Sequence, residues 1–399
     1  MSEIGSIERI TQNRVIRLFK DELQYAYLGN WEEREANSNI EEGLLSKYLI
    51  RKEYSKTHIN KVIQELKSIA TNFNDSLYTT NKNVYNQLRY GVKVKISASE
   101  NYETIPIINW NDFEDNDFAI AEEVSYKGNK TKRPDIVIYV NGIALGVLEL
   151  KRSTVSISEG IRQNIVNQTD SFIEPFFATV QFVFAGNDTE GLRYGTIKTQ
   201  EKYFLKWKED EEDSSRLLLD KYLLKMCNKS RFLEIIHDFI LFDGGIKKLP
   251  RVHQYFGIKE AQKFVERYEG GIIWHTQGSG KSIVMVTLAK WILENNPHAR
   301  IVVLTDRDEL DKQIERVFSD VGESIYRTKS GRDLMKQLGE TKPRLLCSLM
   351  HKFGRKEKDN FNEFIKELES QPSIAVGEIF VFVDECHRTQ SGRLHRTMK

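Results

Sequence analysis

The sequence predicts an α/β protein of two domains joined by a short connector. Between residues 105 and 184, short apolar strands with one helix among them indicate a mixed sheet flanked by helices. Further along the chain, apolar runs of strand length alternate with helical patterns, which is typical of a parallel sheet. The segment DGGIKKLPR (residues 243–251) interrupts the helical pattern between these regions. We therefore expect one domain at residues 1–245 and a second at residues 246–399.

The composition is that of a folded protein without a global attraction for polyanions. Of its 399 residues, 40% are hydrophobic and 29% are charged, which is enough apolar surface for more than one core. The 59 basic and 58 acidic residues give a net charge of +1, so any nucleic-acid binding must rest on local patches. Cys227, Cys347 and Cys386 lie far apart without a CxxC pair, which predicts reduced thiols. Because neither a signal peptide nor a membrane-spanning run is present, we expect a cytoplasmic protein that contacts no membrane.

The first domain is predicted to begin with helices and to continue with strands. Apolar residues recur at helical spacing in residues 7–23 and 41–70, and we assign these helices packing roles without chemistry. Further helical patterns occupy residues 217–242. Strands are expected at residues 118–121, 135–140, 143–150 and 180–185, with a helix at residues 158–172.

The second domain is predicted to alternate helices with strands. Helices are expected at residues 254–267, 280–294, 308–318 and 361–368, and strands at residues 271–274, 300–305, 344–348 and 378–384.

A phosphate-binding loop is predicted between the first strand and the following helix of the second domain. The sequence Gly278-Ser279-Gly280-Lys281-Ser282 supplies glycines that let backbone N–H groups face an anion, at a helix N-terminus. Lys281 would lie against the β- and γ-phosphates of ATP, and the Ser282 hydroxyl would bind Mg²⁺. The full GxxxxGK[ST] pattern requires glycine where this chain has His275, a departure that favours the shorter GxGK[ST] form of helicase-type motors.

Two adjacent carboxylates follow a second apolar strand of this domain. Asp384 and Glu385 end the run IFVFVDE. In phosphate-loop motors an acidic residue at this place holds Mg²⁺, which predicts that role for Asp384, while Glu385 would orient the attacking water.

In these two motifs the chain resembles the DEAD/DEAH-type helicases and translocases of superfamily 2, which have a RecA-like fold. More closely, the segments VHQYFGIKEA, HTQGSGKS, TDRDELDKQ, SLMHKF and VDECHRTQSG resemble the motor region of the restriction (R) subunit of type I restriction-modification systems. The resemblance implies that Gln254 reads adenine, that Thr276 belongs to the nucleotide site, and that Asp306, Arg307 and Gln313 lie in a DNA-contacting segment. Cys386 stands where alanine is commoner.

Such R subunits carry a PD-(D/E)xK nuclease upstream of the motor, and the stretch RPDIVIYVNGIALGVLELK (residues 133–151) matches its pattern with Asp135, Glu149 and Lys151. Hydrolysis of a phosphodiester benefits from a cation bound by hard oxygen ligands. By resemblance, Asp135 and Glu149 would hold Mg²⁺ together with the Leu150 carbonyl. Lys151 would position the nucleophilic water or stabilise negative charge.

Strand geometry constrains this hairpin further. With a regular two-residue turn at Asn141-Gly142, Asp135 would pair with Leu148 and point away from Glu149, because side chains alternate between the two faces. We therefore predict a three-residue loop with a bulge at Gly142, which pairs Asp135 with Val147, or an equivalent bulge within a strand.

The roles of several other residues near the motif are open. The family often has a QxxxY element on the next helix. Here the candidates are Gln163 and Gln168, and four residues after Gln168 stands Phe172, so the role of both glutamines stays open. Lys132 and Arg133 precede the motif, where either a DNA phosphate contact or plain solvent exposure fits them.

The resemblance implies an endonuclease and ATP-dependent translocase of double-stranded DNA that uses ATP and Mg²⁺ and works with methylation (M) and specificity (S) subunits. Motors of this type close a second RecA-like domain over the ATP, so this chain alone is expected to turn over little ATP. The alternatives are a helicase-nuclease fusion of another defence or repair system, and a binding module for DNA or subunits whose acidic hairpin is not catalytic.

Overall fold

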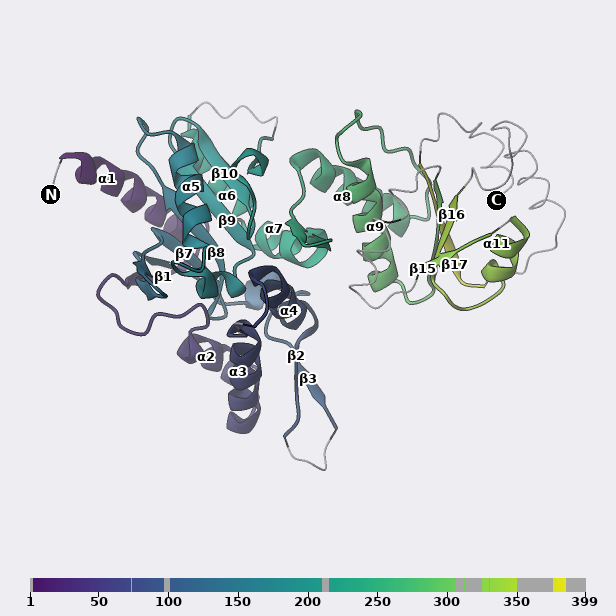
Figure 1. Ribbon diagram of the computed structural model, residues 1–399, viewed down its shortest axis with the longest axis horizontal. Coiled ribbons are helices and arrows are strands. Elements are labelled where there is room, and N and C mark those ends of the chain that lie inside the picture. Colours follow the sequence, from purple (N-terminus) through teal and green to yellow (C-terminus); the bar gives the residue numbers. More distant parts are fainter. Residues whose placement is uncertain are drawn as a thin grey trace. The chain divides into compact units, whose positions relative to one another are not determined.

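The computed structural model describes residues 3–72, 74–96, 101–209, 215–305, 312, 325–329, 331–349 and 376–384. These residues fold into two compact units, one of residues 1–240 and 245–252 and the other of residues 241–244 and 253–399. Figure 1 labels the helices and strands of both units.

The first unit is built on a mixed seven-stranded sheet. Its order is β1-β4-β7-β8-β9-β10-β11, and neighbouring strands are antiparallel except for the parallel pairs β1–β4 and β8–β9. The strands are β1 (Ala26–Asn30), β4 (Phe118–Glu122), β7 (Ile136–Val140), β8 (Ile143–Leu150), β9 (Phe182–Asn187), β10 (Gly191–Gly195) and β11 (Leu205–Lys206).

Helices α5 (Ile157–Asn167) and α6 (Leu218–Met226) cover opposite faces of this sheet. Ala185 of β9 faces α5, where a Cβ on Gly160 would lie 3.3 Å from its Cβ. The next residue, Gly186, faces α6, where a Cβ would lie 2.5 Å from Leu219. Consecutive strand residues point to opposite faces, so β9 is covered on both sides and its residues are all buried. The parallel step from β8 to β9 requires a crossover, and α5 supplies it.

The helices before the sheet differ in part from the prediction. The predicted helix at residues 7–23 is α1 (Glu3–Arg17), extended by a π-helical turn (Leu18–Glu22). The predicted helical segment 41–70 is two helices, because Glu53 takes a left-handed φ of 64° and Ser55 caps a new helix through the His58 N–H. These helices are α2 (Glu42–Arg51) and α3 (Lys56–Ala70), and α4 (Leu77–Tyr90), β2 (Val92–Val94) and β3 (Glu103–Ile105) follow.

The remaining elements of this unit lie near the ends of the main strands. The helix predicted at residues 158–172 ends earlier, at Asn167. The helical pattern at residues 217–242 is α6, α7 (Lys229–Glu234) and a π-helical turn (Ile235–Phe239). β5 (Tyr126–Lys127) and β6 (Thr131–Lys132) form a short antiparallel pair. β12 (Leu241–Asp243) and β13 (Ile246–Lys248) form a separate two-stranded sheet.

The hairpin of β7 and β8 has a two-residue turn and an internal bulge. Val140 pairs with Ile143, but the register shifts between Tyr139 and Ile138, which leaves Leu145 as the extra residue of β8. The shift pairs Ile136 with Leu148, so the next pair along is Asp135 and Glu149. The predicted three-residue loop and the pairing of Asp135 with Val147 are therefore wrong. The alternative prediction, a bulge within a strand that brings both carboxylates to one face, is confirmed.

The turn stays short because both of its residues are held in left-handed conformations. Asn141 (φ 51°) donates from its side chain to the Ile107 carbonyl, at 2.9 Å, and to the Asn116 side-chain oxygen, at 2.8 Å. Gly142 (φ 81°) accepts at 2.8 Å from the Glu41 N–H, just before α2. These values fit a type I′ turn. The register shift therefore occurs within β8. There the Leu145 carbonyl accepts a hydrogen bond from the Gln181 N–H at 2.8 Å.

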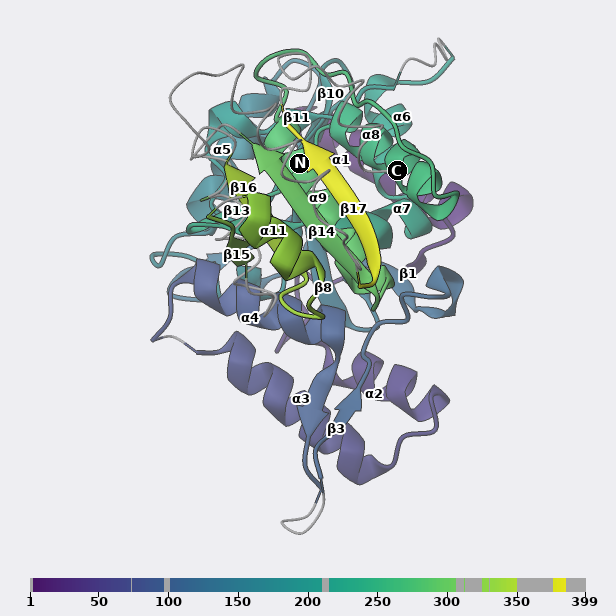
Figure 2. The same cartoon turned by 90° about the vertical axis from the view of Figure 1, so that its right-hand side faces the viewer.

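The second unit contains a parallel four-stranded sheet with the order β15-β16-β14-β17, seen in Figure 2 with β17 in yellow. The predicted helices at residues 254–267 and 280–294 and the strands at residues 300–305, 344–348 and 378–384 are present within a few residues. The elements are α8 (Val252–Glu266), α9 (Lys281–Asn295), β14 (Ala299–Thr305), β15 (Ile325–Arg327), α11 (Gly331–Leu338), β16 (Leu345–Leu349) and β17 (Glu378–Val383).

The strand predicted at residues 271–274 is wrong. This segment pairs with no strand among the described residues, and the side chains of Ile272 and Trp274 are 76% and 87% exposed. Both edges of β14 are already taken, by β16 and β17. An apolar run becomes a strand only where a neighbour accepts its backbone N–H and C=O groups. The helices predicted at residues 308–318 and 361–368 lie outside the described residues, apart from residue 312.

In the part of the chain that the structure describes, no helix combines the length and the apolar character needed to cross a bilayer. Cys227 and Cys347 are buried and form no disulfide among the described residues, and Cys386 lies outside these residues.

The turn of the hairpin gives a testable prediction. A Cβ on Gly142 would lie 2.7 Å from the Leu44 Cβ and 2.8 Å from the Glu41 carbonyl, whereas Gly245 has a similar φ of 88° and nothing within 4 Å. Gly142→Ala should lower the free energy of unfolding by roughly 3 kcal/mol, and Gly245→Ala by about 1 kcal/mol, because only the first adds a clash to the left-handed strain. Urea unfolding measures both. Equal losses in the two variants would show that the contact with α2 does not hold the turn.

Candidate functional site

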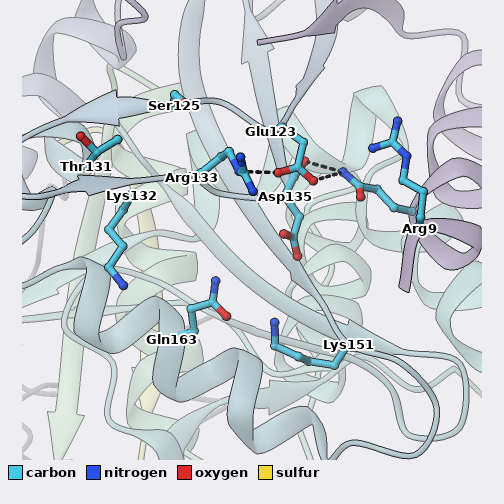
Figure 3. A pocket seen from close by; sticks show the side chains of 10 residues that line it. Arg9, Glu123, Ser125, Thr131, Lys132, Arg133, Asp135, Lys151 and Gln163 are labelled. Atoms are coloured by element: carbon cyan, nitrogen blue, oxygen red, sulfur yellow. Dashed lines mark hydrogen bonds and ion pairs between the residues drawn. The ribbon is translucent and has the colours of Figure 1, made fainter. Parts of the chain in front are cut away.

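A cleft of about 570 Å³ opens in the first unit beside the β7–β8 hairpin. Figure 3 shows Asp135 near its middle, with Lys151 and Gln163 on one side and Arg133 and Glu123 on the other. The full lining is Arg9, Gln12, Glu123, Ser125, Thr131, Lys132, Arg133, Asp135, Lys151 and Gln163. Two of the predicted catalytic residues, Asp135 and Lys151, therefore share one cavity.

Glu149 lies directly behind this lining, with no exposed surface. Asp135 sits just before β7, opposite Glu149, and its Oδ2 accepts from the Leu150 N–H at 2.6 Å. Lys151 follows β8 two residues after Glu149, so both side chains leave the same face of the strand. The structure thus brings Asp135, Glu149 and Lys151 together, as the sequence predicts.

Two amide side chains of α5 hold the Glu149 carboxylate. Gln163 Nε2 donates to Oε2 at 2.7 Å, and Asn167 Nδ2 donates to Oε1 at 3.3 Å. These residues are four apart, so they occupy one face of the helix. Gln163 and Asn167 thus have the spacing of the QxxxY element, with asparagine in place of tyrosine. The other candidate, Gln168, has no such helical pair, because α5 ends before Phe172.

Gln168 has a structural role instead. Its side chain is buried, donates to the Asn164 carbonyl at 3.1 Å and accepts from the Lys198 N–H at 2.7 Å. These contacts tie the end of α5 to the loop that holds Lys198.

Burial raises the pKa of Glu149 well above its usual range, and the nearby Asp135 carboxylate raises the pKa further. The Lys151 ammonium acts in the opposite direction. A buried carboxyl next to another carboxylate favours its neutral form until a cation arrives. The site therefore has the electrostatics of a cation-binding centre.

The N-terminal helix contributes to this cleft, which the sequence analysis missed. Gln12 of α1 donates to Glu123 Oε1 at 3.0 Å and to the Asp135 carbonyl at 3.3 Å. Arg9 pairs with Glu122 at 2.6 Å. Nothing in the local sequence separates these polar residues from a solvated helix face, because their partners lie more than 100 residues away.

The donors at the hairpin suit Mg²⁺, a cation that takes one or two carboxylates and completes its shell with other oxygens. Asp135 and Glu149 supply carboxylates, and the buried Asn167 side-chain oxygen has no hydrogen-bond partner among the described residues. The described residues contain no group of three His, Cys, Asp or Glu side chains arranged for a metal. The Asn167 oxygen, backbone oxygens and water would therefore have to provide the other ligands.

The second unit holds the predicted phosphate loop. Gly278 (φ 78°) and Gly280 (φ 85°) are both left-handed, and Lys281 starts α9. The Lys281 ammonium donates to the His275 carbonyl at 3.2 Å, across the loop. The first N–H groups of a helix have no partner within it, so this end of α9 can accept an anion.

Gln254 and Thr276 both contact this loop. Gln254, buried on α8, donates from Nε2 to the Ser279 carbonyl at 2.9 Å. A Cβ on Gly280 would lie 2.4 Å from the same nitrogen, so only glycine fits there. The Thr276 carbonyl accepts from the Ser279 hydroxyl at 2.7 Å. Ser282 is the second residue of α9 and is half-buried.

Asp384 follows β17 and is buried, 8% exposed. Its N–H donates to the Leu304 carbonyl at 2.9 Å, and its Oδ2 accepts from the Thr305 hydroxyl at 3.5 Å. These contacts place Asp384 where the parallel strands β14 and β17 end. Glu385, Asp306, Arg307 and Gln313 lie outside the described residues.

The two units thus define a protein class that combines a carboxylate-lined cleft on a mixed sheet with a phosphate loop on a parallel sheet. Residues 7–202 match the family described as type I restriction enzyme R protein N terminus. Residues 253–399 match the family described as SWI2/SNF2 ATPase.

Relatives with assigned names agree with these matches. The HindI type I restriction enzyme endonuclease subunit of Haemophilus influenzae is 29% identical over 352 residues, which cover 79% of this chain and 32% of the relative. A Methanocaldococcus jannaschii protein, provisionally named the MjaIXP type I restriction enzyme endonuclease subunit, is 26% identical over 373 residues, 84% of this chain and 35% of the relative. The chain is thus similar to R proteins of type I restriction enzymes over most of its length, and it spans about a third of the length of these relatives.

The raised pKa of Glu149 predicts a pH dependence of stability without metal. Because the folded pKa is raised, the retained proton stabilises the fold fully below the pKa of an unfolded glutamate, about 4.3, and this contribution is lost as the pH rises through the folded pKa. Glu149→Gln does not titrate, so its stability relative to the wild type should increase between pH 4 and pH 8. Urea unfolding in EDTA measures this difference, with the exposed Glu159→Gln as the matched control. A difference that is constant across this range would contradict the electrostatic account of the site.

Proposed function

We propose that this chain is the nuclease and first motor part of a type I restriction enzyme R subunit, which cleaves double-stranded DNA and uses ATP to move it. The observation that carries the proposal is the register of β7 and β8, which pairs Ile136 with Leu148 and so brings Asp135 opposite the buried Glu149, while Asp135 and Lys151 line one cleft. Without the cross-strand pairing, the same residue types would lie on different faces and form no site.

The topology supports a PD-(D/E)xK nuclease in the first unit. The antiparallel strands β4, β7 and β8 lead through α5 to β9, which is parallel to β8, and the acidic residues lie at the ends of β7 and β8. We assign residues 1–245 to this nuclease domain and residues 246–399 to a RecA-like motor domain.

In the nuclease site each residue has a distinct task. Asp135 and Glu149 would hold Mg²⁺, which when bound supplies positive charge next to the phosphate and lowers the pKa of water. Gln163 and Asn167 fix the Glu149 carboxylate, so that little reorganisation is needed during reaction. Lys151 is placed to orient the attacking water or to stabilise negative charge that develops on the phosphate oxygens.

In the motor site, the loop of Gly278, Ser279 and Gly280 would surround the ATP phosphates. Lys281 would bind the β- and γ-phosphates, and Ser282 and Asp384 would hold the Mg²⁺ of the nucleotide. Glu385 would orient the attacking water. Gln254, which now fixes the loop through Ser279, would read adenine, and Thr276 completes the nucleotide site.

The partners of this proposal are double-stranded DNA and the M and S subunits, which select the target. We also propose that the chain works in the cytoplasm, together with its DNA and these subunits.

Loss of Asp135 provides the main test of the nuclease assignment. In the full-length R subunit assembled with its M and S partners, Asp135→Ala should lower plasmid cleavage at least a hundredfold and leave DNA-stimulated ATP hydrolysis within twofold of the wild type. The physical reason is loss of a cation ligand. Asp75→Ala, which removes an exposed carboxylate of the same unit, is the control and should cleave normally. Normal cleavage by Asp135→Ala would favour a binding module whose acidic hairpin is not catalytic.

Loss of Lys281 tests the motor assignment separately. Lys281→Ala should abolish ATP hydrolysis by the same complex, since the β- and γ-phosphates lose their ammonium partner. Lys263→Ala changes an exposed lysine of α8 and should hydrolyse ATP at the wild-type rate. ATP hydrolysis by Lys281→Ala above a tenth of the control would refute the assignment of the loop.

A further inference from the structure

The β5–β6 hairpin (Tyr126–Lys132) forms one wall of the nuclease cleft. Thr131 and Lys132 of β6 line the cavity together with Asp135 and Lys151. In Figure 3 the Lys132 side chain extends into the cleft toward Gln163, and Lys151 lies on the other side of Gln163. Two ammonium groups thus lie on the two sides of Gln163 in the same cleft as Asp135.

The basic residues of this cleft differ in their partners. Arg133 pairs with the Glu32 carboxylate and, at 2.7 Å, with Glu123. Arg9 is held by Glu122. Lys132 contacts no carboxylate among the described residues; its one contact is the ring of Phe172, with the ammonium 4.4 Å from the centroid. Its positive charge is therefore not neutralised within this part of the protein.

The backbone of Phe172 is tied to the β5–β6 hairpin. A Cβ on Gly128 would lie 2.1 Å from the Phe172 carbonyl, and the Asn129 N–H donates to the same oxygen at 3.0 Å. The Asn129 side chain also donates to the Asp170 carbonyl, at 2.6 Å. These contacts fix the hairpin to the segment that carries the ring. A cation over an aromatic face is attracted without loss of its charge.

We propose that Lys132 binds a phosphate of the DNA strand next to the one that is cleaved, and that Phe172 orients it for this contact. Arg133 is the other residue that the sequence analysis considered for a DNA phosphate contact. Its role here is structural, because it fixes Glu123. The proposal rests on the nuclease function. It adds the path of the DNA backbone, which crosses the cleft from Lys132 toward Lys151.

The electrostatics of the cleft require such a contact. Asp135 and Glu123 face the cavity, and carboxylates repel a polyanion that must approach them closely. An ammonium without a carboxylate partner offsets this repulsion at the place where the backbone enters. It releases a bound counterion from the DNA when it contacts a phosphate, which makes its contribution dependent on salt.

Lys130 provides a matched control for the test. It lies over the same ring at 5.5 Å and is exposed, but it is not part of the cleft lining. In the full R subunit with its M and S partners, Lys132→Met should slow DNA cleavage about fivefold at 0.15 M salt, the effect of one lost phosphate contact. Lys130→Met should stay within twofold of the wild type, and Lys132→Arg should retain most activity because it keeps the charge.

Salt dependence and ATP hydrolysis complete the experiment. The slope of log cleavage rate against log salt should decrease by about 1 in Lys132→Met and should not change in Lys130→Met. DNA-stimulated ATP hydrolysis should be normal in both variants, which shows that they fold and assemble. Equal rates and slopes for the two methionine variants would overturn the phosphate contact. Asp135→Ala is measured in parallel: its full activity would instead refute the nuclease function itself, so the two failures are distinct.

Discussion

The cross-strand register of the β7–β8 hairpin is the constraint on which the rest of the site depends. One extra residue in β8, Leu145, shifts the pairing so that Asp135 lies opposite Glu149. Side chains in a strand alternate between faces, so a shift of one residue decides whether two carboxylates share a cation or lie on opposite sides of the sheet. The Asn141-Gly142 turn cannot absorb this shift, because contacts with Asn116 and α2 hold it in a two-residue form. The bulge is therefore what brings the two carboxylates to one face of the sheet.

The residues around the hairpin determine the charge and the orientation of the Glu149 carboxylate. Glu149 is fully buried, and each of its carboxylate oxygens accepts a hydrogen bond from an N–H group. This arrangement favours a pair of carboxylates with a bound cation over the same pair without one. The α5 helix is essential for two reasons: it makes the crossover from β8 to β9, and its inner face carries Gln163 and Asn167. The same element thus determines the parallel pairing of the sheet and the orientation of the carboxylate.

Local sequence patterns predicted most of the elements and the core of the site, whereas long-range contacts decided the remainder. The alternation of strands and helices and the phosphate loop follow from spacing, whereas the trio of Asp135, Glu149 and Lys151 was predicted because the motor motifs downstream resemble those of type I R subunits. The contacts of Arg9 and Gln12 follow from neither, since their partners Glu122 and Glu123 are distant in sequence. The error at residues 271–274 has the same origin, because an apolar run needs a free strand edge to become a strand. The choice of Gln163 over Gln168 depended on where α5 ends, which the sequence did not mark with glycine or proline.

Anomalous diffraction from crystals soaked in Mn²⁺ tests the central claim most directly, since Mn²⁺ prefers the same hard oxygen ligands as Mg²⁺. The account predicts an anomalous peak between Asp135 and Glu149, with an oxygen of each carboxylate at about 2.1 Å from the cation, the distance expected for such small divalent ions. A peak bound to only one of the two carboxylates, or no peak there while Mn²⁺ occupies other sites of the same crystal, would contradict the claim that the bulged hairpin builds a cation site.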